Sequence, residues 1–142
     1  MKLVSSSIAG LCVATAAFVA LLATAASAGD DEYEREWTRL SAAHDRLIAT
    51  EAGRDYERRL TEVHNGFWQS LYAQCIDGAR KQGLTSFRAI AVVDENGTVT
   101  KFLTLPNSEN LACFAKGMVG RRYPAPPTAP FYERFSIFVV GD

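Results

Sequence analysis

The 142-residue sequence has few of the residues that usually carry enzyme chemistry. It contains only two histidines, His44 and His64, and three cysteines. No serine lies in a Gly-x-Ser-x-Gly setting, and no His, Cys, Asp and Glu residues have the spacing of a metal motif. A carboxylate neighbours each histidine in sequence, Asp45 and Glu62 respectively, so a His–carboxylate acid–base pair is conceivable. Ordinary helix-surface histidines are the simpler interpretation, and we expect no catalytic residue, cofactor or metal.

The sequence also lacks a strong charge of either sign. Its 15 Lys and Arg residues nearly balance its 16 Asp and Glu residues, which gives a net charge of −1. Nucleic acid and anionic membrane surfaces attract proteins through a concentrated positive field. The near-neutral composition therefore favours neither of these partners.

Long apolar runs are absent except at the N-terminus. Lys2 is the only charge in residues 1–28, residues 8–22 are rich in Ala, Val and Leu, and Ala26-Ser27-Ala28 has the small-x-small pattern of a cleavage site. This layout predicts a signal peptide over residues 1–28, cleaved after Ala28, and a periplasmic or secreted protein with no remaining membrane span. An uncleaved anchor is the alternative, because residues 8–28 are just long enough to cross a bilayer.

Removal of the signal peptide leaves two cysteines, Cys75 and Cys113. An even number of cysteines in an exported chain predicts a disulfide. A redox or metal site is the alternative, but the chain has no Cys-x-x-Cys and no histidine near either cysteine. We therefore expect a structural Cys75–Cys113 bridge.

Two helices are predicted in the first half of the mature chain. Apolar residues recur at steps of three and four over residues 31–49, where Trp37 and Tyr33 lie on the inner face, and again over residues 55–81. Gly53 is the expected breaker between the helices, and Gly83 the expected end of the second. The sequence leaves open whether the two helices form an antiparallel pair or one long bent rod.

A β-hairpin is predicted next, from residues 87–94 and 98–105. Asn96-Gly97 between them favours a two-residue type I′ turn, with Glu95 paired to Thr98. This register places two sets of side chains on opposite faces of the sheet. The first set is Ile90, Val92, Val99, Leu103 and Leu105; the second is Phe87, Ala89, Ala91 and Phe102.

The C-terminal part predicts a short helix over residues 109–119, capped by Asn107 or Ser108 and ended by Gly120. Four prolines exclude regular structure from residues 121–130, and residues 131–140 have high β-propensity. The fold class is therefore α+β: a three-stranded antiparallel sheet with helices on one face, in the order αββαβ, preceded by an extra N-terminal helix.

This order, with "VVDENGTVTKF", "NLACFAKGM" and "YPAPPTAPFYERF", resembles the C-terminal domains of the TonB/TolA group, and the TolA branch in particular. The resemblance covers about residues 66–140. It divides the chain into a signal peptide (1–28), an N-terminal helical segment (29–65) and a TonB/TolA-like domain (66–142). The chain departs from the group because it has no long linker, and because Cys75 lies in the helix before the sheet rather than on a strand.

The resemblance implies a non-enzymatic protein that binds a protein partner in the cell envelope. A three-stranded sheet has two open edges, which invite strand addition. Glu133 and Arg134 are the only charges that would guard the last strand. The candidate partner-binding residues are Phe131, Tyr132, Arg134, Phe135 and Phe138. A homodimer, a periplasmic inhibitor or immunity-type protein, and a redox-active disulfide protein are the alternatives.

Overall fold

The computed structural model describes the backbone of residues 16–140 and the side chains of residues 29–140. The chain forms two compact units, residues 1–32 and residues 33–142, and everything below concerns the second. The predicted signal peptide lies outside the residues whose side chains are described. Within the described part of the chain, no helix is long and apolar enough to cross a membrane.

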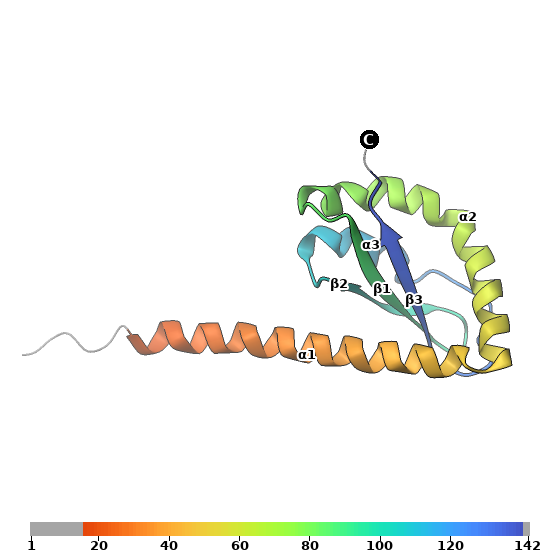
Figure 1. Ribbon diagram of the computed structural model, residues 1–142, viewed down its shortest axis with the longest axis horizontal. Coiled ribbons are helices and arrows are strands. Elements are labelled where there is room, and N and C mark those ends of the chain that lie inside the picture. Colours follow the sequence, from red (N-terminus) through yellow and green to blue (C-terminus); the bar gives the residue numbers. More distant parts are fainter. Residues whose placement is uncertain (1–15, 141–142) are drawn as a thin grey trace, which may run out of the picture. The chain divides into compact units, whose positions relative to one another are not determined.

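The elements follow the predicted order and confirm the α+β class (Figure 1). The helices are α1 (Ala16–Ile48), α2 (Glu51–Lys81), the 3-10 turn η1 (Glu109–Leu111) and α3 (Ala112–Met118). The strands are β1 (Ser86–Val93), β2 (Val99–Leu105) and β3 (Phe131–Phe138). The sheet is antiparallel with the order β2-β1-β3, so β1 is central and β3 lies at an edge.

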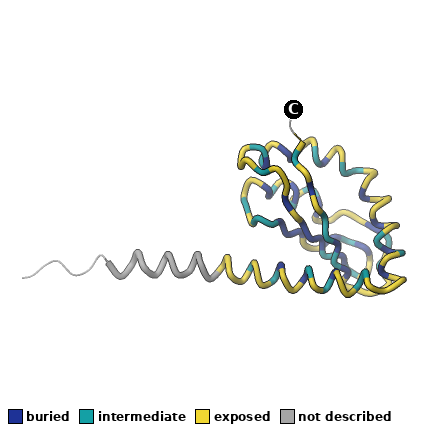
Figure 2. The backbone as a smooth tube through the Cα atoms, viewed as in Figure 1, coloured by how far each residue is buried: buried dark blue, intermediate teal, exposed yellow. Residues whose placement is uncertain are grey.

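The two faces of the sheet are covered by different helices, and the buried residues concentrate along the strands between them (Figure 2). Helices α2 and α3 cover the face that carries the larger core, which includes Leu60, Leu71, Ile76, Phe87, Ala91, Phe102, Phe114 and Phe131. The additional helix α1 covers the opposite face through Trp37 and Leu40, which pack on Ile90 and Leu103. The helices of the αββαβ part, α2 and α3, thus lie on one face of the sheet, and the extra helix α1 covers the other face.

The connection between α1 and α2 differs from the prediction in its breaker residue. Thr50 is the N-cap of α2: its Oγ1 accepts a hydrogen bond from the Gly53 amide at 3.0 Å. Gly53 itself lies inside the helix, where an added Cβ would be 1.9 Å from the Leu47 carbonyl oxygen. Its role is to let the two helices approach closely at the corner, and the helices are separate elements rather than one rod.

The hairpin turn also differs from the prediction. The Asp94 amide bonds to the Thr98 carbonyl oxygen, so Glu95, Asn96 and Gly97 form the loop, with Gly97 at a φ of +82°. The register then shifts between Val92 and Val93, which pair with Lys101 and Val99 respectively. This bulge moves Val99 into the α2/α3 core, and the prediction that Val99 shares a face with Ile90 is wrong.

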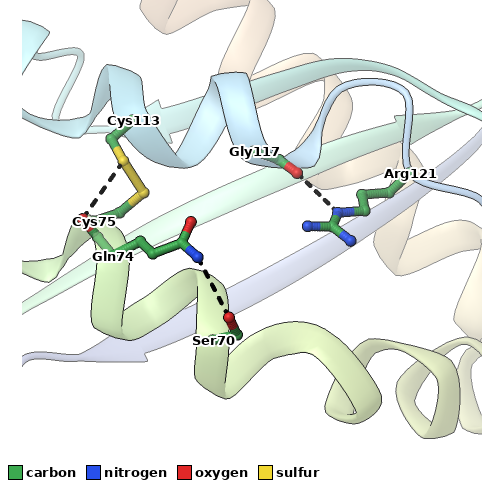
Figure 3. Close-up of a disulfide and its surroundings, with 6 residues drawn as sticks. All are labelled: Ser70, Gln74, Cys75, Cys113, Gly117 and Arg121. Atoms are coloured by element: carbon green, nitrogen blue, oxygen red, sulfur yellow. Dashed lines mark hydrogen bonds between the residues drawn. A yellow bond between two sulfur atoms is a disulfide. The ribbon is translucent and has the colours of Figure 1, made fainter.

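The predicted disulfide is present and joins α2 to α3 (Figure 3). The Cα atoms of Cys75 and Cys113 are 5.4 Å apart, and the Cys113 sulfur lies 3.9 Å from the Gln74 carbonyl oxygen. At the other end of α3, the Arg121 Nε donates to the Gly117 carbonyl oxygen at 3.0 Å. The bridge therefore fixes α3 against α2 on the side of the larger core.

Candidate functional site

Strand β3 pairs with β1 along its whole length, from Ser86 opposite Phe138 to Val93 opposite Phe131, and no strand of the described residues lies on its outer side. In an antiparallel ladder, alternate residues direct both backbone groups to the same side of the strand. The outward-facing residues can be identified because helix side chains bond to two of them, Tyr132 and Phe138. Residues 132, 134, 136 and 138 therefore face away from β1.

Both ends of this outer edge are tied to the helices. The His44 Nδ1 donates to the Tyr132 carbonyl oxygen at 2.8 Å. At the other end, the Tyr72 hydroxyl donates to the Phe138 carbonyl oxygen at 3.0 Å and accepts from the Val140 amide at 2.9 Å. Between these ties, the outward N–H and C=O groups of Arg134 and Ser136 have no hydrogen-bond partner among the described residues. Tyr132 and Phe138 are thus tied through their carbonyl groups, whereas both outward backbone groups are open at Arg134 and Ser136.

The opposite edge of the sheet, on β2, is more fully covered. The Tyr33 hydroxyl bonds to both the amide and the carbonyl of Thr104, at 2.8 and 2.7 Å. At the start of β2, the Val99 amide donates to the Arg121 carbonyl oxygen and the Val99 carbonyl accepts from Gly120. Of the two edges, β3 therefore offers the longer open stretch of backbone.

A groove of about 500 Å³ runs between α2 and the open part of β3. Helix α2 bends near its middle and so arches along β3 (Figure 1). The groove is lined from α2 by Thr61, His64, Asn65, Trp68 and Tyr72, and from β3 by residues 133–138. Phe135 stacks on the His64 ring at 4.5 Å between centroids, and His64 stacks on Trp68 at 4.8 Å. The wall of the groove is therefore largely aromatic.

His64 is buried, so the prediction that it is a surface residue is wrong. It is 6% exposed, and its Nδ1 lies 2.9 Å from the Tyr123 hydroxyl oxygen. Burial lowers the pKa of His64 from 6.5 to about 4, which keeps the ring uncharged at neutral pH. The ring acts as part of the aromatic wall.

The five candidate partner-binding residues have different environments. Phe131 is fully buried against Tyr56, 4.6 Å away between ring centroids, and belongs to the core. Tyr132 and Phe135 are half-buried. The Arg134 guanidinium crosses to α1, where it donates to Ser41 Oγ at 2.7 Å and Asp45 Oδ1 at 2.9 Å. Phe138 is 71% exposed and is the one large apolar side chain of β3 that faces solvent.

A second cluster lies where α1, α2 and β3 meet. One ring nitrogen of His44 and one carboxylate oxygen each of Glu57 and Glu133 lie within 4.8 Å of one another. His44 and Glu133 are both buried, at 3% and 4% exposed, so neither is the surface residue that was predicted. The pKa of Glu133 is raised to about 8, mainly by burial and also by the charge of Glu57, while the charge of Arg134 acts to lower it.

This cluster was not predicted because its three residues come from three distant segments. The clearest indication in the sequence is the position of Glu133 in its strand. Residues two apart in a strand lie on the same face, so Glu133 shares its face with Phe131, Phe135 and Ile137. A charged residue therefore lies among apolar residues on the buried face. His44, at a helical step from Leu40, gives a similar but weaker indication.

No protein-family model, curated protein or solved structure matches this chain.

Proposed function

We propose that this protein is a non-enzymatic interaction module of the periplasm, which binds an extended segment of a cell-envelope protein as an added strand on β3. The observation that carries the proposal is the open backbone at Arg134 and Ser136 on an edge strand. Unpaired N–H and C=O groups of this kind recognise another chain through main-chain hydrogen bonds.

The groove beside β3 indicates the character of the bound segment. Side chains of an added strand alternate between the two faces of the sheet. Those directed toward α2 would enter the groove and meet Trp68, Tyr72 and Phe135. On the other face, the Arg134 guanidinium is already bonded to Asp45. The segment that fits is extended, with apolar residues at every second position and no requirement for a charge.

Two further features support this function. The elements α2, β1, β2, α3 and β3 have the αββαβ order on which the resemblance to the TonB/TolA group rests. The disulfide between α2 and α3 suits an oxidising compartment such as the periplasm. The proposal therefore includes two further statements: this chain is exported to the periplasm, and its partner is a protein of the cell envelope.

The test uses Ser136→Pro with Ser136→Ala as its matched control. Proline removes the outward N–H of residue 136 and leaves the bonds to β1 intact, because proline is tolerated on the outer side of an edge strand. Alanine removes the hydroxyl and keeps the N–H. We expect envelope proteins captured by the wild type and by Ser136→Ala to be lost with Ser136→Pro, and bound partner to slow amide exchange at Arg134 and Ser136.

Equal capture by Ser136→Pro, with no protection of these amides, would exclude strand addition at β3. Sedimentation velocity of the purified chain addresses self-association. A dimer that dissociates in Ser136→Pro would show that the edge pairs two copies of this chain instead of an envelope partner. Exposed Phe138 is the second position to vary, since Phe138→Asp changes the same surface without entering the core.

A further inference from the structure

Three elements bring potential metal ligands to one point beside the α1–α2 corner. His44 lies in the last turns of α1, Glu57 in the second turn of α2 and Glu133 in the first half of β3. Their ligand atoms lie within 4.8 Å of one another. Glu57 is partly exposed, whereas the other two residues are buried. Such a convergence of imidazole and carboxylate groups, drawn from distant segments, is created by the fold alone.

The orientation of His44 suits a metal ligand. Its Nδ1 lies 2.8 Å from the Tyr132 carbonyl oxygen. A carbonyl oxygen only accepts hydrogen bonds, so Nδ1 carries the proton and Nε2 of the neutral ring keeps its lone pair. Metal-binding histidines usually have this arrangement, in which a backbone carbonyl fixes the ring and selects the nitrogen that ligates.

Glu133 has a buried oxygen that the described residues leave unpaired. The side chain is 4% exposed, and no described residue forms a hydrogen bond with its Oε2. The carboxylate of Glu57 lies beside it, and the neighbouring Arg134 guanidinium is directed to Ser41 and Asp45 on α1. A buried carboxylate next to a second carboxylate is unfavourable unless it takes up a proton or a cation lies between the two groups.

We propose that His44, Glu57 and Glu133 form a binding site for a divalent ion of the Zn²⁺ type. One imidazole nitrogen with two carboxylate oxygens is a donor set that Zn²⁺ accepts, whereas Ca²⁺ requires six to eight oxygen ligands. Zinc bonds of about 2.0–2.2 Å place neighbouring ligand atoms about 3.4 Å apart. The cluster must therefore contract by up to about 1.4 Å, and Glu57, the partly exposed ligand, is the side chain expected to move.

A bound ion would join α1 to both α2 and β3. It would add a cross-link on the α1 side of the sheet, where no covalent bond exists among the described residues. Three protein ligands leave one position of a tetrahedral site for water. The site does not depend on partner binding at β3, and its test is independent of that proposal.

The test is titration of the purified, EDTA-treated full chain with ZnCl₂, followed by calorimetry and thermal unfolding. Glu133→Gln and Glu57→Gln remove one ligand each with little change of shape, and Glu62→Gln, on an exposed position of α2, is the matched control. We expect each ligand variant to bind Zn²⁺ at least about 100-fold more weakly, because even residues that only support a ligand contribute about 10- to 100-fold. The control should bind like the wild type.

Two further readouts separate ligation from a structural role. Long-range ¹H–¹⁵N spectra should show Zn²⁺ on Nε2 of His44 while Nδ1 keeps its proton. Without metal and above pH 8, where Glu133 is ionised, Glu133→Gln should unfold at or above the temperature of the wild type, because it removes the repulsion with Glu57. With Zn²⁺ the order should reverse. Wild-type affinity in both ligand variants, or equal stabilisation by CaCl₂ and ZnCl₂, would overturn the proposal.

Discussion

The two faces of the sheet are stabilised in different ways. The face under α2 and α3 has a continuous core and a disulfide that joins its two helices. Among the described residues, the apolar side chains fully buried on the face under α1 are Trp37, Leu40, Ile90 and Leu103, with a few half-buried residues around them. Polar contacts make up much of the rest. They include the hydrogen bonds from Tyr33 to Thr104, from Lys101 to Glu36, and from Arg134 to Ser41 and Asp45.

This difference indicates that the two faces differ in local stability. Regions with few buried apolar contacts and exposed polar bonds open more readily than regions with an extensive core. Salt bridges between partly exposed groups, such as Lys101 with Glu36, contribute little. We therefore expect residues 33–48 to open before the α2/α3 side, and the three predictions below test this order.

The largest effect is expected from the disulfide on the α2/α3 side. Replacing both Cys75 and Cys113 with Ala opens a loop with a sequence separation of 38. The loss of this constraint on the unfolded chain should lower the free energy of unfolding by about 4 kcal/mol. Denaturant unfolding measures the change. Wild type with reductant should match the double variant, and an unchanged midpoint would show that the bridge contributes nothing to stability.

A somewhat smaller effect is expected from Leu40→Ala on the α1 side. Leu40 is 2% exposed, and its truncation should cost about 3 kcal/mol. Because this face has the smaller core, hydrogen exchange should accelerate mainly at residues 33–48. Leu71→Ala, a truncation of the same size in the larger core, is the control and should accelerate exchange throughout residues 33–140. Identical exchange patterns in the two variants would mean that the faces unfold together.

The smallest effect is expected in the pH dependence of stability, which the carboxyl of Glu133, between the two faces, should cause. Burial holds its pKa at about 8 in the folded protein, against 4.5 ordinarily. At intermediate pH the folded state keeps a proton that the unfolded state has released, so stability falls as pH rises. The groups around it are His44 of α1, Glu57 of α2 and Arg134 of β3.

Between pH 6.5 and 8, metal-free protein should lose about 1.5 kcal/mol, and Glu133→Gln should lack this loss. His64 acts in the opposite direction at lower pH, because its pKa is lowered to about 4. Its contribution is present above pH 6.5 and is lost as pH falls toward 4, so it does not affect the chosen window. Denaturant unfolding at each pH gives the measurement. Parallel curves for wild type and Glu133→Gln would show that the carboxyl is not perturbed.

Several elements could be predicted because their cause is local. Helical spacing gave α2 and α3, Gly83 and Gly120 end these helices with positive φ, and Ser108 caps η1. The Asn96-Gly97 pair located the hairpin, but the Asp94 carboxylate, which accepts bonds from the Asn96 and Thr98 amides, favours a longer turn. That small difference shifted the register at the bulge and placed Val99 on the other face.

The environments of the two histidines could not be predicted, since helical periodicity does not identify what lies opposite a residue. His64 is buried because α2 bends over the edge of β3, and His44 is buried because α1 packs on the face opposite α2. The same limit applies to Gly53. A glycine between two helices resembles a breaker, and only the approach of the Leu47 carbonyl shows that it is a contact position.

The sequence by itself determined the order of the elements, the pairing of Cys75 with Cys113 and the identity of the last strand. The order of the elements and the last strand follow from periodicity and turn residues, which act over short distances. The cysteine pairing follows from a count, because only two cysteines remain after the predicted signal peptide. The tertiary structure decided that β3 lies at an edge, that α1 takes the second face, and that His44, Glu57 and Glu133 meet. These outcomes depend on packing between segments far apart in the chain, where the lowest free energy is a property of the whole fold.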